Sequence, residues 1–339
     1  MIIDFKNIIT KEEIIFKGNS SGGNMKRLIF LLVFLSIVSI FIGVKDIPLW
    51  SIFNLGQDQI QVLFLSRIPR LISIITAGVG LSICGLIMQR ITQNRFVSPT
   101  TAGTIDSAKL GILISIIIFP GSSTFTKMTI SFIFALAGSF VFLGILKKIK
   151  YRNNIIIPLM GLMLGSVLDS ITTLIAYRYE LVQNISSWLQ GDFSLVIKGR
   201  YELLYISIPF VIMAFLYANK FTLAGMGKDF SLSLGLNYNK VVSIGLIIVA
   251  LISSTVIITV GRIPFLGLII PNLVSMYRGD NLKKNILATG VLGSIFLLFC
   301  DILGRIIIYP YEVPIGLTVG VLGSFIFLYL LARRKGHEG

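Results

Sequence analysis

The stretch IGLIIVALISSTVIITV, residues 244–260, decides the class of fold. It contains no charged residue, and a helix built from it has apolar side chains on every face. A strand of a transmembrane β-barrel would instead alternate apolar and polar residues over about ten positions. Because an α-helix crosses a hydrocarbon core of roughly 30 Å with about 20 apolar residues, the stretch predicts a membrane-spanning helix.

Composition extends this prediction to the whole chain. Of its 339 residues, 55% are hydrophobic and 13% are charged, whereas an ordinary soluble domain has about 25% charged residues. Similar apolar runs recur from Leu28 almost to the C-terminus. We therefore expect an all-α, polytopic membrane protein with about ten transmembrane helices. These are expected over residues 28–44, 70–92, 104–119, 125–146, 155–177, 201–218, 241–260, 264–277, 286–308 and 315–332.

The basic residues predict how the chain lies in the membrane. The net charge is +15, but Lys and Arg fall mainly in short gaps between apolar runs, so topology explains them better than a nucleic-acid partner. Since basic loops stay in the cytoplasm, both termini are predicted to be cytoplasmic. Residues 1–24 lack the features of a secretory signal and are predicted to be a cytoplasmic extension of a membrane domain over residues 25–339. A start at Met25 is the alternative.

Residues that common enzymes need are missing. The stretch GMGKDF offers only Gly227-Lys228 followed by Asp229, which is not a phosphate-binding loop. The single histidine, His337, gives neither a histidine-based metal site nor a Ser/His triad. Cys84 and Cys300 both lie in apolar runs and predict no disulfide framework. We expect no catalytic residue, no metal site and no cofactor bound by this chain.

Small residues recur at a spacing typical of packed membrane helices. Gly161 and Gly165 form one G-x-x-x-G pair, and Gly316 and Gly320 form another. This spacing lets helix backbones approach closely. Close packing is favoured over a direct role in a transport pathway.

Ionisable residues inside the apolar runs are candidate functional groups, because charge within a membrane is costly. Asp106 and Lys109 lie three residues apart, and Asp301 and Arg305 lie four apart, so each pair shares a helix face. Mutual neutralisation is the favoured interpretation of both pairs. Asp169 has no obvious local partner and is expected either to line a polar pathway or to hydrogen-bond a neighbouring helix.

Two loops depart from the general pattern. SRIPRL, residues 66–71, puts Arg67 and Arg70 on the predicted outer side, against the trend of the other basic residues. The inner loop over residues 219–240 interleaves leucines with polar residues and glycines. This indicates short helices that dock on another protein, or on the protein's own helices. Both loops are therefore candidates for function.

Several stretches together resemble the FecCD-type permeases of ABC importers for iron-siderophores and vitamin B12. They are residues 66–103, SSWLQGDFS at 186–194, GMGKDFSLSLGLN at 225–237, residues 261–280 and residues 301–331. The resemblance implies a ten-helix permease domain in the bacterial cytoplasmic membrane. It also implies a second permease subunit, two cytoplasmic ATPase subunits that hold ATP and Mg, and an extracytoplasmic solute-binding protein.

The resemblance also implies roles for single residues. In the family, arginines that match Arg67, Arg70 and Arg305 hold carboxylates of the binding protein, an arrangement suited to a guanidinium group. Internal pairing with residues such as Asp301 is the alternative. The positions that match the family's ATPase-contacting loop are Gly227, Lys228, Asp229, Ser233, Leu234 and Gly235.

The expected function is import of a ferric siderophore by alternating access. Haem or vitamin B12 is the alternative cargo, and a secondary transporter driven by an ion gradient, with Asp169 or Asp106 as coupling group, is the rival class. The block NRFVSPTTAGTIDSAKLG, residues 94–111, resembles permeases that pair with a different permease chain. A heterodimer is therefore favoured over a homodimer.

Overall fold

The structure is a computed structural model that describes residues 21–43, 57–148, 156–194, 196, 201–279 and 281–335. These residues are predominantly helical, with one isolated parallel bridge between Gln190 and Arg262. The helices that precede residue 150 are α2 (Ser21–Phe41), α3 (Gln57–Val62), the π-helix η2 (Leu63–Arg67), α4 (Ile68–Ile91), α5 (Thr104–Ile118) and α6 (Thr124–Lys148). The later ones are α7 (Ile156–Arg178), α8 (Val182–Leu189), the 3-10 helix η3 (Tyr201–Ile206), α9 (Ser207–Leu216), α10 (Ala218–Ala224), α11 (Lys228–Ser233), α12 (Tyr238–Thr259), α13 (Leu266–Arg278), α14 (Leu282–Ile306) and α15 (Ile315–Lys335).

The predicted all-α class is confirmed, and each expected range contains a helix. Within the described residues, five helices are long and apolar enough to cross a membrane, or six if η3 and α9 form one bent span with α10. The five are Gln59–Ile91, Thr124–Lys148, Ile156–Arg178, Tyr238–Thr259 and Leu282–Ile306. This criterion thus supports five to six spans among the described residues, fewer than the ten expected, in part because α5 and α13 have fewer than 18 residues and α15 counts only as a shorter apolar helix over Ile315–Leu330.

Two predicted boundaries are wrong. The helix expected to begin at Arg70 starts earlier and runs without a break through SRIPRL. Pro69 has no N–H to donate, and the wider π-turn η2 directly before it keeps the chain helical. The helix expected over residues 201–218 is found as η3 and α9, and the chain then bends by 61° between α9 and α10. The first helix begins at Ser21, inside the predicted extension, most of which lies outside the described residues.

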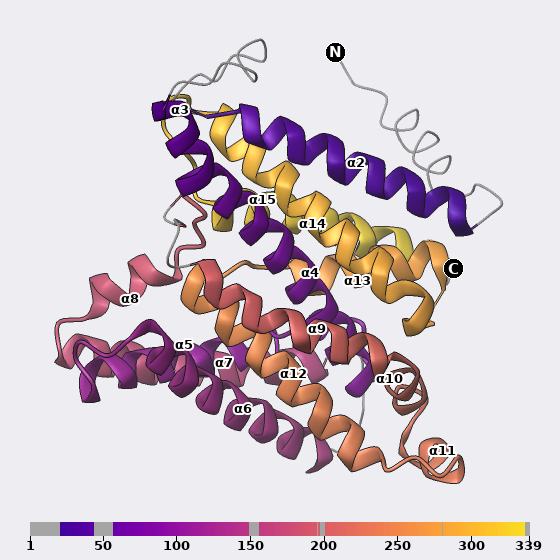
Figure 1. The fold of residues 1–339 in the computed structure, drawn as a ribbon. Coiled ribbons are helices and arrows are strands. Elements are labelled where there is room, and N and C mark those ends of the chain that lie inside the picture. The colour runs from indigo at the N-terminus through magenta and orange to yellow at the C-terminus, as the bar shows by residue number, and fades with distance from the viewer. Residues whose placement is uncertain are drawn as a thin grey trace.

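Helix α4 forms the centre of the bundle, and α12, α13 and α14 pack against it (Figure 1). Glycine permits these close approaches. A Cβ atom at Gly85 would lie 1.7 Å from the carbonyl oxygen of Gly267 on α13. A Cβ atom at Gly78 would lie 2.7 Å from Cα of Ser294 on α14. The core therefore depends on glycines in α4 that bring helix backbones into contact.

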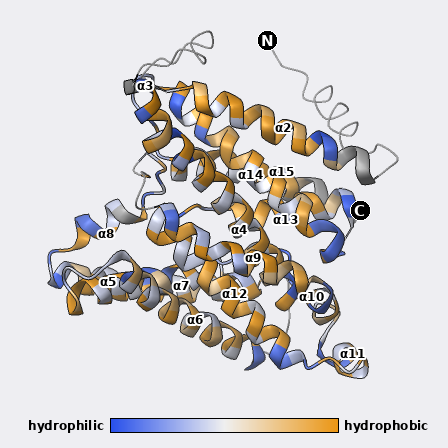
Figure 2. Ribbon diagram, in the orientation of Figure 1, coloured by the Kyte–Doolittle hydropathy of each residue, from blue (hydrophilic) through white to orange (hydrophobic). Residues whose placement is uncertain are grey.

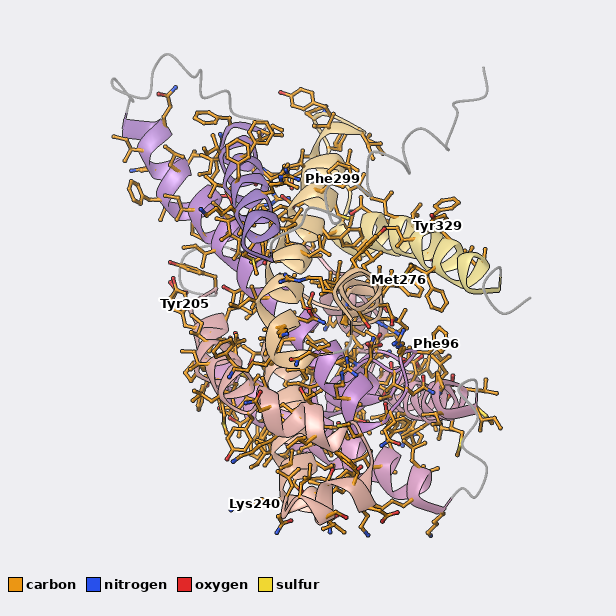
Figure 3. All side chains as sticks on the ribbon, turned by 90° about the vertical axis from the view of Figure 1, so that its right-hand side faces the viewer. Phe96, Tyr205, Lys240, Met276, Phe299 and Tyr329 are labelled. Atoms are coloured by element: carbon orange, nitrogen blue, oxygen red, sulfur yellow. The ribbon has the colours of Figure 1, made fainter. Side chains whose placement is uncertain are left out.

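The molecule has two ends that differ in what they contain. In Figure 1, α3 and α8 lie to the left, and the start of α2, the end of α15 and α11 lie to the right. Figure 2 shows apolar residues along the long helices and hydrophilic residues gathered toward their ends. Side chains fill the bundle in Figure 3, where Phe299 lies toward the end with α3 and Lys240 lies at the opposite end. We call these the outer and inner ends, after the predicted topology.

Candidate functional sites

A network of charged residues holds the outer end together. We define the outer arginine network as Arg67, Arg70, Asp301, Arg305 and Glu312. Arg70 on α4 donates from Nε and Nη2 to Asp301 Oδ1 on α14, over 3.2 and 2.7 Å. Its Nη1 donates to Glu312 Oε2 over 2.6 Å. One guanidinium group thus joins α4 to both α14 and the segment that precedes α15.

The other two arginines cap the C-terminal end of α2. Arg305 Nη1 donates to the carbonyl oxygens of Ser39 and Ile42 over 2.9 and 2.8 Å. Arg67 Nη1 donates to the carbonyl oxygen of Ile40 over 2.5 Å. The last carbonyl groups of a helix have no donor within the helix, and positive charge is favourable there. The two guanidinium groups therefore fasten α2 to α4 and α14.

These contacts bear on the predicted docking role of the three arginines. Only 8% of Arg67 and 5% of Arg305 is exposed. Arg305 also pairs with Asp301, as the four-residue spacing led us to expect. The guanidinium groups thus have internal acceptors, which was the alternative to docking, and their contact with a binding protein stays a prediction. Glu312 was not identified from the sequence, although it is an isolated acid in an apolar stretch.

A second charge cluster lies within the helices. Lys109 Nζ on α5 lies 2.6 Å from Asp169 Oδ1 on α7. Arg262 Nη1 lies 3.7 Å from Asp106 Oδ1. The expected pairing of Asp106 with Lys109 is therefore wrong, because each finds a closer partner on another element. Asp169 accepts a hydrogen bond from a neighbouring helix, which confirms one of its two predicted interpretations, whereas the sequence does not predict the pairing of Arg262 with Asp106.

The two glycine pairs lie where backbones meet. A Cβ atom at Gly161 would lie 2.1 Å from the carbonyl oxygen of Thr101, and one at Gly165 would lie 2.5 Å from Asp106 Oδ2. Gly316 donates its N–H to Gly191 over 3.0 Å. Near Gly320 the nearest atom, Pro264 Cγ, is 3.7 Å from the Cβ position. Three of the four glycines thus occupy tight contacts, and Gly320 an ordinary one.

The segment SSWLQGDFS is held by backbone hydrogen bonds. Arg262 donates its N–H to Leu189 over 3.1 Å, and Asp192 donates to Val260 over 2.9 Å. Gly191 lies between these bonds, and a Cβ atom there would lie 2.4 Å from the carbonyl oxygen of Arg262. This pairing fixes the end of α8 and the polar residues that follow it against the segment between α12 and α13.

The inner loop folds into two short helices, α10 and α11. Gly227 precedes α11 with φ of 115° and Gly235 follows it with φ of 74°, conformations that favour glycine. The hydroxyl of Ser231 donates to the carbonyl oxygens of Leu223 and Gly227, over 2.9 and 2.6 Å. This hydroxyl fixes α11 against α10. The sequence had predicted short helices here.

Four large apolar side chains of this loop face outward. We define the inner apolar patch as Met226, Phe230, Leu232 and Leu234, which are between 46% and 57% exposed. Among the predicted coupling residues, Leu234 belongs to the patch, Lys228 and Asp229 lie exposed in the first turn of α11, and Ser233 donates to the carbonyl oxygen of Asp229. Contiguous exposed apolar residues mark interaction surfaces. Met226 and Phe230 were missed, since their exposure depends on the fold.

Within the described residues, no group of three His, Cys, Asp or Glu side chains could hold a metal ion. Cys84 and Cys300 are both free and buried.

Comparison with known proteins decides what kind of molecule carries these sites. The model of the FecCD transport family matches residues 31–333. The chain belongs to the FecCD transport family. The family predicted from the sequence is therefore confirmed.

Relatives and one solved structure add detail to this family membership. The chain is 62% identical over 313 residues to the petrobactin import system permease protein YclN of Bacillus subtilis, covering 92% of this chain and 99% of the relative. It is 39% identical over 308 residues to the ferric-anguibactin transport system permease protein FatD of Vibrio anguillarum, covering 91% and 98%. A solved metal-chelate type ABC transporter in an inward-facing conformation matches with a TM-score of 0.78 and 23% identity, covering 91% and 98%.

The FecCD chain is thus a permease subunit of an ABC importer, a transport component rather than an enzyme. Such a permease works with ATPase subunits and a binding protein. This membership decides against the rival class of ion-driven secondary transporters. It also places the FecCD chain among multi-pass membrane proteins, in agreement with its apolar helices.

Proposed function

We propose that this permease carries a ferric siderophore across the bacterial cytoplasmic membrane, of the kind for which its relative, the petrobactin permease YclN, is named. The observation that carries the proposal is the extent of that similarity, which covers nearly the full length of both chains. The anguibactin relative is also named for a siderophore. Both names favour a siderophore over haem or vitamin B12 as cargo.

The proposed topology has ten crossings and both termini in the cytoplasm. Its support is the helix found in each of the ten expected ranges, together with the basic residues of the loops. The start of α2 and the end of α15 also lie toward the side of the molecule that carries α11 (Figure 1). Residues 1–24 would then extend into the cytoplasm.

We place the transport pathway along the polar face of α7. Ser166, Asp169, Ser170 and Thr173 follow helical spacing, and all four are at least partly exposed. The side chain of Asp169 remains 49% exposed even though it pairs with Lys109. Polar and ionisable groups are costly against lipid and usually face protein or water. A second, non-identical permease subunit on this face would enclose a polar pathway between the two chains.

The inner apolar patch is the proposed contact with the ATPase, which binds ATP and Mg. Movement of that subunit would act on α11 and, through α10 and the bend at Tyr217, on α9. A different contact with each nucleotide state would bias the permease toward an outward or an inward opening. At the outer end, the binding protein would dock near Arg67, Arg70 and Arg305.

Reconstitution tests the proposed cargo. The permease, its partner permease, its ATPase and its binding protein would be placed in vesicles and supplied with ferric petrobactin, haem or cobalamin. We expect ATP-dependent uptake of the ferric siderophore alone. Uptake of haem or cobalamin in preference to the siderophore would contradict the proposal, and loss of uptake with an uncoupler at constant ATP would contradict the ABC mechanism.

A further inference from the structure

A cavity of about 540 Å³ lies at the inner end, where α4, α6, α7, α11 and α12 come together. Its walls carry apolar side chains, among them Phe140, Leu143 and Ile157. Its polar lining includes Asn239 and Ser243 of α12. Two lysines, Lys147 and Lys228, complete the lining, and none of the described lining residues is acidic. The cavity thus combines an apolar wall with unbalanced positive charge.

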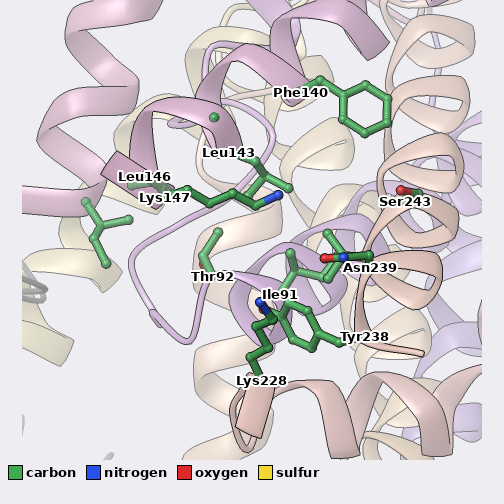
Figure 4. A pocket seen from close by; sticks show the side chains of 13 residues that line it. Ile91, Thr92, Phe140, Leu143, Leu146, Lys147, Lys228, Tyr238, Asn239 and Ser243 are labelled. Atoms are coloured by element: carbon green, nitrogen blue, oxygen red, sulfur yellow. The ribbon is translucent and has the colours of Figure 1, made fainter. Parts of the chain in front are cut away.

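The two lysines come from different elements and meet across the cavity. Lys147 lies in the last turn of α6, and Lys228 is the first residue of α11. In Figure 4 Lys147 reaches into the cavity from the left and Lys228 from below, with Asn239 and Ser243 to the right of their amino groups. Lys147 and Lys228 are both exposed, and two ammonium groups that face one cavity raise the positive potential there, which attracts anions. The cavity is therefore suited to an anionic occupant with several acceptor oxygens.

Helix α6 adds a second, independent feature. Phe140, Gly144 and Lys147 line the cavity at helical spacing, so one face of α6 changes from apolar to cationic toward the inner end. A Cβ atom at Gly144 would meet nothing within 4 Å, so this position leaves open space along the helix. An acyl chain beside Phe140 and Gly144 would bring a charged head group to the level of Lys147. A lipid has this order of apolar and anionic parts, whereas inorganic phosphate does not.

We propose that this cavity binds the phosphate group of an anionic phospholipid from the cytoplasmic leaflet. Lys147 and Lys228 would hold the phosphate oxygens, and Asn239 and Ser243 would donate further hydrogen bonds. Basic pockets between transmembrane helices on the cytoplasmic side are suited to such head groups. The choice of leaflet rests on the topology proposed above. Because Lys228 begins α11, the lipid would join α6 to the loop that we propose contacts the ATPase.

The test measures lipid binding and does not depend on the cargo. The purified importer complex would be titrated with phosphatidylglycerol and with phosphatidylcholine, in detergent, with binding read by native mass spectrometry. We expect tight binding of phosphatidylglycerol only. Since each lysine near an anionic lipid surface contributes about 1 kcal/mol, K147Q should weaken binding about 5-fold, and K147Q with K228Q about 30-fold.

Matched variants separate this site from general surface charge. Lys148 follows Lys147 directly but does not line the cavity, so K148Q should leave the affinity for phosphatidylglycerol unchanged. Equal binding of phosphatidylcholine, or an equal loss in K148Q and K147Q, would overturn the proposal.

A further variant distinguishes a lipid from free phosphate. G144L fills the open space on α6 without changing charge, so it should weaken phosphatidylglycerol binding and spare any binding of inorganic phosphate or ATP. If G144L has no effect on phosphatidylglycerol while K147Q abolishes phosphate binding, the occupant is a soluble phosphate and the lipid assignment is wrong. Thermal unfolding of each variant checks that it is folded.

Discussion

The two ends of this permease differ in how their charged and apolar residues are arranged. At the outer end, Arg70 and Arg305 share the buried carboxylate of Asp301, and arginine side chains cap α2. At the inner end, the apolar residues of α11 face outward. The outer arginine network satisfies most of its polar groups within the chain, although Arg305 Nε has no hydrogen-bond partner among the described residues and residues 306–308, Tyr309 and Tyr311 beside it are exposed. The inner end instead exposes the apolar patch of α11, which another protein would bury. This difference separates a structural connection from a surface suited to a partner.

The same difference predicts which substitutions affect stability and which affect function. Removal of one partner from a buried ion pair leaves an uncompensated charge and costs about 3–5 kcal/mol. Substitution of an exposed residue away from such a feature usually changes stability by less than about 0.5 kcal/mol. Substitutions in the outer arginine network should therefore lower the stability of the permease. Substitutions in the inner apolar patch should leave its stability unchanged and uncouple ATP hydrolysis from transport.

The largest effect is expected for Asp301→Asn. It removes the carboxylate that Arg70 and Arg305 share, so the free energy of unfolding should fall by about 3–5 kcal/mol. Thermal unfolding of the detergent-purified importer would measure the loss as a lower Tm. Asp229→Asn, in the exposed first turn of α11, is the matched control and should leave Tm unchanged. A D301N variant as stable as the native protein would show that the network adds no stability.

The next effect is functional and lies at the opposite end. Leu234→Asp places a charge in the inner apolar patch, where we propose the ATPase binds, and burial of an unpaired charge at a contact is costly. The affinity of the ATPase for the permease should fall by about tenfold or more, which corresponds to roughly 1.4 kcal/mol or more of contact energy, and transport per ATP hydrolysed should fall with it. Leu234→Met keeps the apolar surface and should remain coupled. A normally coupled L234D variant would remove the patch from the proposed ATPase contact.

Helix positions could be predicted from the sequence because a segment that crosses lipid must be a long apolar run. The partners of charged residues on other helices could not be predicted. Arg70 pairs with Asp301 across 231 positions of sequence, and Lys109 pairs with Asp169 across 60. Spacing along one helix indicated the Asp301–Arg305 pair correctly and the Asp106–Lys109 pair wrongly. In the second case, α7 packs directly against α5 and offers Lys109 a closer carboxylate.

The inner loop shows a similar limit. Its glycines and interleaved leucines predicted short helices, since such a pattern suits neither a membrane span nor an ordinary turn. The exposure of Met226 and Phe230 depends on how α11 lies against α10, which the Ser231 hydroxyl fixes. The bend between α9 and α10 could not be predicted, because the residue at the bend, Tyr217, is neither proline nor glycine. Such features follow from packing between segments and not from local composition.

A smaller effect tests whether the outer end also serves as a docking surface. Glu312→Gln removes one internal acceptor of Arg70, and because Glu312 is partly exposed, the stability cost should be about 1 kcal/mol or less. If Arg70 docks carboxylates of the binding protein, its affinity for that protein should rise at low salt, because an internal competitor is gone. Titration of the binding protein at two salt concentrations measures this.

The control for this docking test is Glu180→Gln, an exposed acid after α7, which should change the affinity less. An affinity that is unchanged in E312Q at both salt concentrations would assign Arg70 a structural role alone. The outer arginine network would then serve only to connect helices, and the inner apolar patch would be the proposed partner contact that remains.

The smallest effect on stability is expected between the two ends, at the pair of Lys109 and Asp169. Asp169 is half-exposed, so Asp169→Asn should cost only about 0.2–1 kcal/mol of stability. Ser170→Ala, on the same face of α7, is the matched control for stability. If α7 lines the pathway, D169N should nevertheless reduce siderophore uptake, because it leaves the positive charge of Lys109 without its carboxylate partner. Uptake equal to that of the native importer, at unchanged Tm, would instead make the pair a local contact between α5 and α7.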